Sequence, residues 1–265
     1  LVRFGAVKVP IVHSFHGHHL YDPEFGFFKR NTLNVVERRL AKKSSALITI
    51  GNRVRDELLA VGIGKPDQYL SIAPGIQELK LGNRDAIRNK FGISKDAKVV
   101  LWLGRFTEVK RPDRVLEIAK ELPEFIFVMA GGGELFDSIK NKAPKNVLML
   151  GVQDKNEMWS IANLGLCTSD SEGMPLSLIE AQMAGVPVVS TDVGSVSEIV
   201  QDGDTGFLAS RDSKELAKQI KQAFTSHSRT KMGNAAQLRA KSLFTAEVMI
   251  NAHIELYKKT LDKVA

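Results

Sequence analysis

The stretch SDSEGMPLSLIEAQMAGVPVVS, residues 169–190, places a loop, an apolar helix and a strand in direct succession. The loop at Glu172–Met174 runs into Pro175, and proline suits the first position of a helix, where its missing N–H costs nothing. The helical segment is apolar on nearly every side, so we expect it to be buried. The run VPVVS at 186–190 does not alternate with polar residues, which is typical of a strand covered on both faces.

The same alternation of strand and helix extends through the second part of the chain. Short apolar runs predict strands at 99–104, 125–131, 146–151, 164–169 and 186–190. Apolar spacing of three to four predicts helices at 111–122, 134–143, 156–164 and 175–184, and three more helical segments begin near residues 213, 229 and 245. Strands that alternate with helices predict a doubly wound α/β domain, with a parallel sheet covered on both sides.

The first 75 residues predict a shorter α/β fragment. Strands are expected at 9–15 and 46–51, a basic helix at 28–44, and the segment 69–76 runs into a Pro-Gly turn that marks a domain boundary. The predicted division is a partial domain at 1–75, a second domain at 76–244, and a helix at 245–265 that packs back toward the first domain. The chain begins inside an ongoing element, so we expect further residues before Leu1.

Composition limits the class of protein. The chain is 43% hydrophobic and 25% charged, which excludes broad disorder, and its net charge of +7 suits phosphorylated ligands or an anionic surface. Its single cysteine, Cys167, lies in an apolar run and is expected to be buried and inert. No apolar run is long enough to span a membrane and no signal peptide is present, so we expect a cytoplasmic protein.

Two carboxylates flank the start of the helix at 175–184. Free amides at a helix start bind anions, and Gly173 allows close approach to the backbone. Glu172 lies in the loop at that start, and Glu180 lies just over one turn inside the helix, where a buried carboxylate requires a partner. Sugar and ribose hydroxyls are natural partners. Taken alone, the pattern favours a plainer interpretation, with Glu172 solvated and Glu180 in a structural ion pair.

The stretch EGMPLSLIEAQMAGVPVVS (172–190) resembles the signature of the retaining nucleotide-sugar glycosyltransferases of family 4, the group-1 family with the GT-B fold: Glu, seven residues, Glu, then an alanine-containing helix and G-x-P-V-V. The stretch LWLGRFTEVKRPD (101–113) resembles the family's diphosphate clamp, a G-R pair with a downstream lysine. The resemblance implies that Glu180 binds ribose and Glu172 the donor sugar. It also implies that the diphosphate is bound by Arg105, Lys110, Gly173, Met174, Pro175 and Leu176. Arg111, beside the clamp, is expected to be an ordinary surface residue.

Further segments agree with this family. The glycines of MAGGGE (129–134) do not complete a dinucleotide fingerprint, and we expect close backbone approach there. The segment 150–158 resembles the one that holds the base, which implies roles for Val152 and Gln153. The stretch 191–210 resembles a glycine-rich family motif in which Ser195 replaces the usual second glycine.

Four histidines lie in VPIVHSFHGHHLYD (9–22). Strand alternation places His13 and Phe15 on one face and His16 on the other, which argues against a shared metal site. The segment resembles the family's strand that ends in a catalytic histidine. The resemblance therefore implies that His16 faces the reacting sugar, with Gly17 giving it room, His18 as a second candidate and His13 structural. No cysteine or carboxylate cluster has metal-ligand spacing, so we expect neither a metal nor another cofactor.

The resemblance implies transfer of a sugar from a nucleoside diphosphate sugar, UDP-sugar before GDP-sugar, to an acceptor hydroxyl of a glycan, lipid or small molecule. Nucleic acid is not an expected partner. Two alternatives stay open: a GT-B sugar-nucleotide epimerase, and a non-catalytic sugar-nucleotide-binding fragment. One interpretation of the basic segment 27–43 is peripheral contact with the inner face of an anionic membrane. The plainer interpretation is a solvated helix packed through Leu33, Val36 and Leu40.

Overall fold

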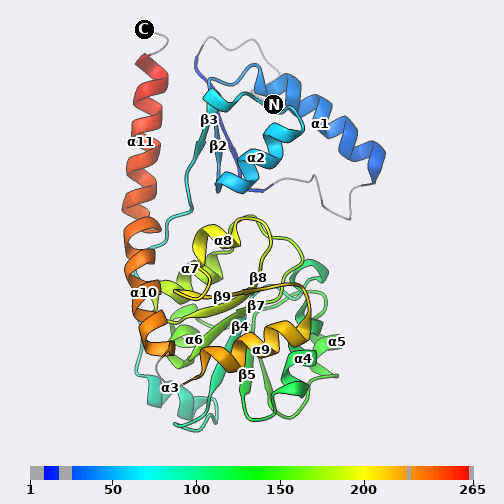
Figure 1. The fold of residues 1–265 in the computed structure, drawn as a ribbon, viewed down its shortest axis with the longest axis vertical. Helices are drawn as coiled ribbons and strands as arrows, with labels where there is room; N and C mark the ends of the chain where they lie inside the picture. The colour runs from blue at the N-terminus through cyan, green and yellow to red at the C-terminus, as the bar shows by residue number, and fades with distance from the viewer. Residues whose placement is uncertain (1–8, 18–25, 226–227, 263–265) are drawn as a thin grey trace. The chain divides into compact units, whose positions relative to one another are not determined.

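The structure, a computed structural model, describes residues 9–17, 26–225 and 228–262. The chain divides into two compact units. The first unit comprises residues 1–75, 172–174 and 243–265, and the second comprises 76–171 and 175–242. The change of unit at Gly75 falls in the Pro-Gly turn of the sequence. Figure 1 shows the elements of both units.

The first unit contains a parallel sheet in the order β1-β2-β3. Its elements are β1 (Val12–Phe15), α1 (Phe27–Ala41), β2 (Ala46–Thr49), α2 (Asn52–Ala60), β3 (Tyr69–Ser71) and α11 (Ala246–Asp262). Strand β2 is central and fully buried, because α2 covers it through Val54 and Leu58. Phe15 pairs with Thr49, so β1 and β2 end at the same level of the sheet.

The second unit is built on a six-stranded parallel sheet in the order β6-β5-β4-β7-β8-β9. The strands are β4 (Val99–Leu103), β5 (Ile126–Ala130), β6 (Val147–Gly151), β7 (Leu164–Cys167), β8 (Val188–Thr191) and β9 (Gly206–Ala209). The first five coincide with the predicted strands, and β9 was not predicted. Sequence order runs outward from β4 on one side and from β7 on the other, which is the doubly wound arrangement.

Helices cover both faces of this sheet (Figure 1). They are α3 (Arg84–Lys90), α4 (Pro112–Glu121), α5 (Phe136–Lys140), α6 (Lys155–Ile161), α7 (Leu176–Met183), α8 (Val196–Ile199), α9 (Ser213–Ala223) and α10 (Ser228–Leu243). Helices α4 and α9 pack together on one face and bury an apolar cluster that includes Phe127, Ile118 and Ile220. Helices α6 and α7 pack against β4, β7 and β8, and α3 packs on α6.

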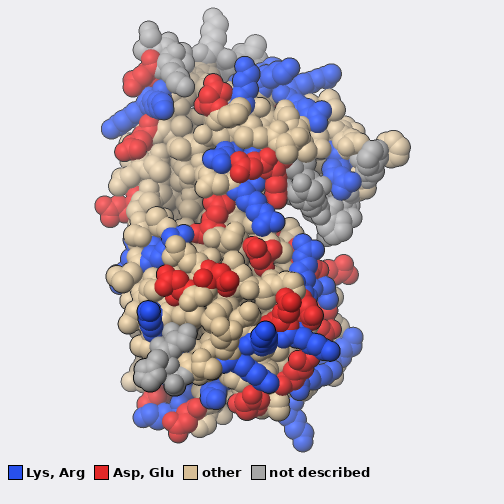
Figure 2. Space-filling view, viewed as in Figure 1, with Lys and Arg blue, Asp and Glu red and all other residues tan. Residues whose placement is uncertain are grey.

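The surface of the second unit is mixed in charge. On the face shown in Figure 2, Lys and Arg side chains are interspersed with Asp and Glu. In the first unit, helix α1 buries Leu40 and half-buries Leu33 and Val36, while Phe28 is exposed. Whether α1 contacts a membrane stays a prediction. Within the described part of the chain, no helix combines the length and the apolar character that a membrane crossing needs.

Candidate functional site

The carboxyl ends of β4 and β7 form the switch point of the sheet in the second unit. The two strands are neighbours, yet the chain leaves them toward opposite edges. Loops that follow such strands diverge, and ligands of open α/β sheets bind outside the carboxyl ends at this point. The loop after β4 carries Arg105 and Lys110, and the loop after β7 leads to α7. Both predicted phosphate-binding segments of the second unit therefore start at the switch point.

Glycines bring the loops after β4 and β5 into backbone contact. Gly131 has φ +138°, and a Cβ there would overlap the carbonyl oxygen of Gly104. Gly133 has φ +149°, and a Cβ there would lie 2.6 Å from the carbonyl oxygen of Phe106. Phe106 in turn donates its N–H to the carbonyl of Gly132 at 2.9 Å. The expected close approach therefore occurs, and it fixes the loop that carries Arg105.

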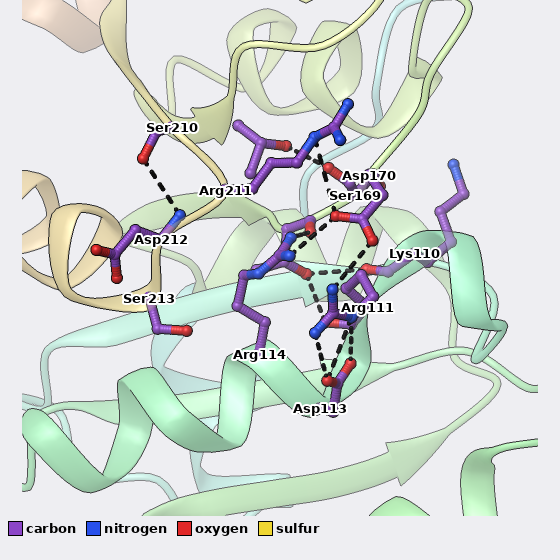
Figure 3. Close-up of polar contacts among 12 residues, drawn as sticks. Lys110, Arg111, Asp113, Arg114, Ser169, Asp170, Ser210, Arg211, Asp212 and Ser213 are labelled. Carbon is purple, nitrogen blue, oxygen red and sulfur yellow. Dashed lines mark hydrogen bonds and ion pairs between the residues drawn. The ribbon is translucent and has the colours of Figure 1, made fainter. Parts of the chain in front are cut away.

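A network of arginines and aspartates ties the loop after β4 to the loop after β7 (Figure 3). Arg111 donates to Asp113 through Nε and Nη2, and through Nη1 to Oδ2 of Asp170 at 3.0 Å. Arg114, buried at the start of α4, donates to Oδ1 of Asp170 at 2.9 Å and to the carbonyl of Thr168. The expectation that Arg111 is an ordinary surface residue is wrong, because Asp170 lies 59 residues away and only folding brings it close.

These contacts lower the pKa of both carboxylates. Burial alone would raise the pKa of Asp170, but hydrogen bonds and charge from Arg114 and Arg111 outweigh it and lower the pKa below the ordinary value. Burial likewise opposes a larger effect of Arg111 on Asp113, whose pKa is also lowered. The hydrogen bonds to Asp113 and Asp170 raise the pKa of Arg111, against its own burial. The network is therefore fully charged near neutral pH.

The two clamp residues lie on this anchored loop. Hydrogen bonds to its backbone carbonyls hold this loop. Thr168 Oγ1 donates to the carbonyls of Lys110 and Arg111, and the Asp170 N–H donates to the carbonyl of Val109. The Lys110 side chain points away from Arg111, Arg114 and Asp113 (Figure 3). Arg105 is exposed, and the described residues offer its side chain no ion pair. The loop that carries both cations is therefore held in place by the contacts of its neighbours.

Helix α7 begins at Leu176, with Pro175 as its N-cap in an extended conformation. The prediction of Pro175 as the first helical residue was wrong by one position, because its ψ of 117° is not helical. Leu178, Ile179, Ala181, Gln182 and Met183 are buried as expected, and Leu176 is half exposed. The free amides of the first turn of α7 thus lie in the second unit beside the loop after β7.

Glu180 is buried within α7, with 7% of the residue exposed, and it is hydrogen-bonded at both oxygens. Lys155 Nζ donates to Oε1 at 2.8 Å, and the Trp159 indole N–H donates to Oε2 at 3.3 Å. Lys155 and Trp159 are four residues apart on α6, so they present one face to the carboxylate. The predicted need for a partner is met by an ion pair, which sequence reasoning had allowed but had not identified.

The base-binding candidates follow β6. Val152 is 80% exposed, and its Cγ2 lies 3.3 Å from where a Cβ of Gly132 would be. Gln153 donates its side-chain N–H to the carbonyl of Leu150 at 2.7 Å, which holds the loop in a turn. Asp154 then caps α6 by accepting from the N–H groups of Asn156 and Glu157. The loop after β6 therefore has a defined shape, with an exposed apolar side chain at its tip.

The remaining candidates belong to the first unit. His16 directly follows β1 and is exposed, and Gly17 has φ +152°. The segment Glu172–Met174 clusters with this unit, and a Cβ on Gly173 would lie 3.0 Å from the carbonyl oxygen of His16 and 2.5 Å from Ile50 Cδ1. A side chain at this position would therefore crowd its protein neighbours, so glycine suits it. The structure brings Gly173 and His16 together, while the parts that Glu172 and His16 play remain predictions.

The other histidines have less claim to a role. His13 packs edge-to-face on Phe15, with ring centroids 4.6 Å apart, as expected for two residues on one strand face. His18 and His19 lie outside the described residues. Among the residues that are described, no three His, Cys, Asp or Glu side chains are arranged to hold a metal ion.

Sequence reasoning missed Asp170, Arg114, Lys155 and Trp159 as parts of the candidate site. The local pattern offered one signal only, that Asp170 directly follows a predicted strand. Their partners lie 21 to 59 residues away. No periodicity or motif spacing reports a contact over such distances.

The strand order, the glycine-linked loops and the helix start at the switch point define a Rossmann-type α/β domain. A family model for the glycosyl transferases group 1 matches residues 83–239, more than half of the chain. The chain therefore belongs to the glycosyl transferases group 1 family.

Curated relatives agree. The chain is 29% identical over 186 residues to N-acetyl-alpha-D-glucosaminyl L-malate synthase of Bacillus anthracis, covering 66% of this chain and 49% of that protein. It is 29% identical over 192 residues to D-inositol 3-phosphate glycosyltransferase of Mycobacterium leprae, covering 66% and 44%. The chain thus spans about half the length of these relatives.

Solved structures show the same fold. Anabaena Alr3699/HepE, solved in complex with UDP and glucose, matches with a TM-score of 0.84 at 20% identity, over 94% of this chain and 71% of that chain. Sucrose-phosphate synthase from Thermosynechococcus elongatus matches with a TM-score of 0.83 at 20% identity, over 95% and 68%. The expectation of the GT-B class of α/β fold is confirmed.

Proposed function

We propose that the chain binds the donor in a glycosyltransferase that moves a sugar from a nucleoside diphosphate sugar to an acceptor hydroxyl, with retention at the anomeric carbon. The observation that carries the proposal is the buried Glu180, just over one turn inside a helix that starts at the switch point of a doubly wound sheet. The resemblance implies that a carboxylate at this place binds the ribose hydroxyls while the diphosphate lies at the helix start.

The diphosphate would be bound by charge and by backbone amides. Arg105 and Lys110 supply two cations, and the first turn of α7, with Gly173 to Leu176, supplies N–H groups and the positive end of the helix dipole. Sugar transfer leaves negative charge on the departing diphosphate, so groups fixed in advance around it lower the barrier. The Arg111–Asp170–Arg114 network holds the clamp loop in place for this purpose.

Glu180 would accept hydrogen bonds from the ribose hydroxyls. Its oxygens each accept one bond from the protein, and a carboxylate has about four lone-pair sites, so acceptor capacity remains. Lys155 is half exposed and can yield part of its contact to a ligand. Val152 and Gln153 are proposed to contact the base, Glu172 the donor sugar, and His16 the reacting face. These last assignments rest on the sequence resemblance.

The relatives suggest which ligands to test. The similar HepE structures hold UDP, UDP-glucose or UDP with glucose, and a TarM structure holds UDP together with a glycan. UDP is therefore proposed as the nucleotide, and a glycan as the first acceptor class to test. No metal or cofactor is invoked, since the proposed clamp uses cationic side chains and amides.

Calorimetric titration with UDP and GDP tests the proposal. We expect UDP to bind, and Glu180→Gln to weaken it at least about tenfold, because one charged hydrogen bond contributes roughly 1.5–3 kcal/mol. Glu157→Gln is the matched control, because Glu157 lies on α6 and also pairs with a lysine, Lys90, at 2.7 Å, but outside the candidate site. Absence of binding by both nucleotides, or wild-type affinity in Glu180→Gln, would refute the proposal.

The reaction is tested with a UDP-sugar panel and NMR of the anomeric proton. Release of UDP with a sugar product of unchanged anomeric configuration is the expected result. Isomerisation of the sugar nucleotide without acceptor would identify the epimerase alternative, and nucleotide binding without turnover would identify the non-catalytic one.

A further inference from the structure

A cavity of about 770 Å³ lies at the amino ends of the strands in the second unit. Its lining includes the residues just before β4, β7 and β8, together with parts of α3, α6 and α10. In a parallel sheet the amino ends lie opposite the switch-point edge, and five strand residues rise about 16 Å. The cavity therefore lies at the other end of the sheet from the candidate donor site, and the two share only Trp159, which lines the cavity and donates to Glu180.

The lining is strongly cationic. It contains Arg84, Arg88, Lys95, Lys98 and Arg229, against a single carboxylate, Asp96. Lys95 is drawn toward Asp85 at 3.2 Å, and Lys98 lies over the ring of Phe125. The three arginines have no such anionic partner: within the described part of the chain, no carboxylate oxygen comes within ion-pair distance of their guanidinium groups.

Arg88 is held in place by neutral groups. It is 1% exposed and donates to the carbonyls of Ser94, Lys95, Ala97 and Ile161 and to Asn163 Oδ1. Its Nε is buried and has no hydrogen-bond partner among the described residues. Burial lowers the pKa of Arg88 to about 10, with Arg84 adding to the effect. A positive charge is thus fixed beside the cavity without a direct ion pair among the described residues, although the nearby charges of Asp85 and Asp96 partly offset it.

Arg84 retains unused donors. Its Nη1 donates to the carbonyls of Ser160 and Ala162, and among the described residues Nη2 and Nε donate no hydrogen bond. Burial and the charge of Arg229 lower the pKa of Arg84 against a smaller opposing effect of Asp85, so the two guanidinium groups repel each other across the cavity. An anion between them would turn this repulsion into two attractions, and guanidinium groups bind phosphate with two parallel hydrogen bonds.

We propose that this cavity is a second anion-binding site that takes a phosphorylated small molecule through Arg84 and Arg229. Its volume is within the range of small-molecule sites and exceeds what one phosphate group fills. The turn at 184–187, with Ala184, Gly185 and Pro187, offers an uncharged wall for the rest of the ligand. The proposal is independent of the donor site and does not require the glycosyltransferase assignment.

The cavity contains its own reporter. Trp159 lines it and is one of two tryptophans in the chain, the other being Trp102. In a Trp102→Phe background, Trp159 is the only indole, so an anion entering the cavity changes its emission. Because Trp159 also donates to Glu180, the emission change caused by UDP alone is recorded first and subtracted. The titrant is pyrophosphate at low ionic strength, added with and without saturating UDP. Calorimetry on the natural chain, with the donor site saturated by UDP, provides the same measurement without the background substitution.

We expect saturable binding with one pyrophosphate in the cavity, unaffected by UDP or by Arg105→Gln. Arg84→Gln and Arg229→Gln are each expected to weaken it at least about tenfold, since each removes a charged donor pair. Lys120→Gln, which removes an exposed cation on α4 across the sheet, is the control and is expected to change nothing.

Three outcomes would overturn the proposal: no saturable binding, loss of binding on addition of UDP or in Arg105→Gln, or equal weakening by Lys120→Gln. Arg84→Lys guards against a folding artefact, because it keeps the charge and loses the fork. We expect it to bind with intermediate affinity, and urea midpoints of all variants verify that they fold. Failure of UDP to bind would refute the proposed function and leave this site standing.

Discussion

Arginines lie at both ends of the sheet in the second unit, and their hydrogen-bond partners differ between the two ends. At the carboxyl end, Arg111 and Arg114 bond to Asp113 and Asp170, so positive and negative charges are built in together. At the amino end, Arg84 and Arg88 bond to backbone carbonyls and an asparagine. Carbonyls satisfy N–H donors but leave the net charge in place. The first arrangement is suited to fixing loops, and the second retains attraction for an anion.

The largest expected effect is on the free energy of unfolding, and it tests whether Arg88, which donates to backbone carbonyls, also stabilises the fold. Arg88→Met removes five hydrogen bonds that join the segment 94–97 to residues 161–163. The free energy of unfolding is expected to fall by about 4 kcal/mol, because the abandoned acceptors stay buried. Urea denaturation measures it. Arg88→Lys keeps the charge but not the fork and should lose most of the same stability; full retention in Arg88→Lys would contradict this reasoning.

The next largest effect is expected when the ion pair between Arg114 and Asp170 is broken. Asp170→Ala leaves Arg114, whose side chain is 5% exposed, without its carboxylate, and we expect the free energy of unfolding to fall by about 2–3 kcal/mol. Asp85→Ala is the matched control, since Asp85 pairs with the exposed Lys95 and should cost under about 1 kcal/mol. Equal losses in the two variants would show that burial of Arg114 does not strengthen the pair.

The pH dependence of this loss follows from the sign of the pKa shift. The pKa of Asp170 is lower in the folded protein than its unfolded value of about 3.9, so the unfolded chain binds the proton first as the pH falls. The stabilisation is therefore complete above about pH 5 and is lost as the pH falls through the folded-state pKa. The difference in unfolding free energy between the wild type and Asp170→Ala should shrink below about pH 4. A difference that stays constant down to acid-induced unfolding would exclude an ionic origin.

Much of this fold could be predicted from the sequence, because its signals are local. Strands β4 to β8 are apolar runs of four or five residues between turn residues, and the nearly uniform apolarity of the α7 segment predicts a buried helix. Strand β9 was missed because GFLA is short and lies among turn-forming residues. Helix α3 was missed because RDAIRNK has no apolar periodicity and is held by Arg88 contacts to distant segments.

The site was predictable only where a motif is contiguous. Glu180, Arg105 and Lys110 were reached through the spacing of two short stretches. Lys155 and Trp159, which hold Glu180, and Asp170, which anchors the clamp loop, are joined to their partners by tertiary contacts alone. Arg84 and Arg229 are 145 residues apart in the sequence and meet only at one cavity. A single sequence does not report such pairs.

The smallest expected effect is the sharpest test of the comparison, because salt should act in opposite directions at the two ends. Raising sodium chloride from 0.02 to 0.5 M shortens the screening length from about 20 to about 4 Å. At the amino end, salt relieves the repulsion between Arg84 and Arg229 in the wild type. The unfolding free energy of Arg229→Gln relative to the wild type should therefore fall by about 0.5 kcal/mol between low and high salt. The contact of Arg229 with the Phe224 ring adds a loss common to both salts and cancels from the difference. At the carboxyl end the same salt weakens an attraction, so Asp170→Ala should become less costly. Shifts of the same sign in both variants would mean that the arginines at the amino end are already neutralised, and the distinction between the two ends would not hold.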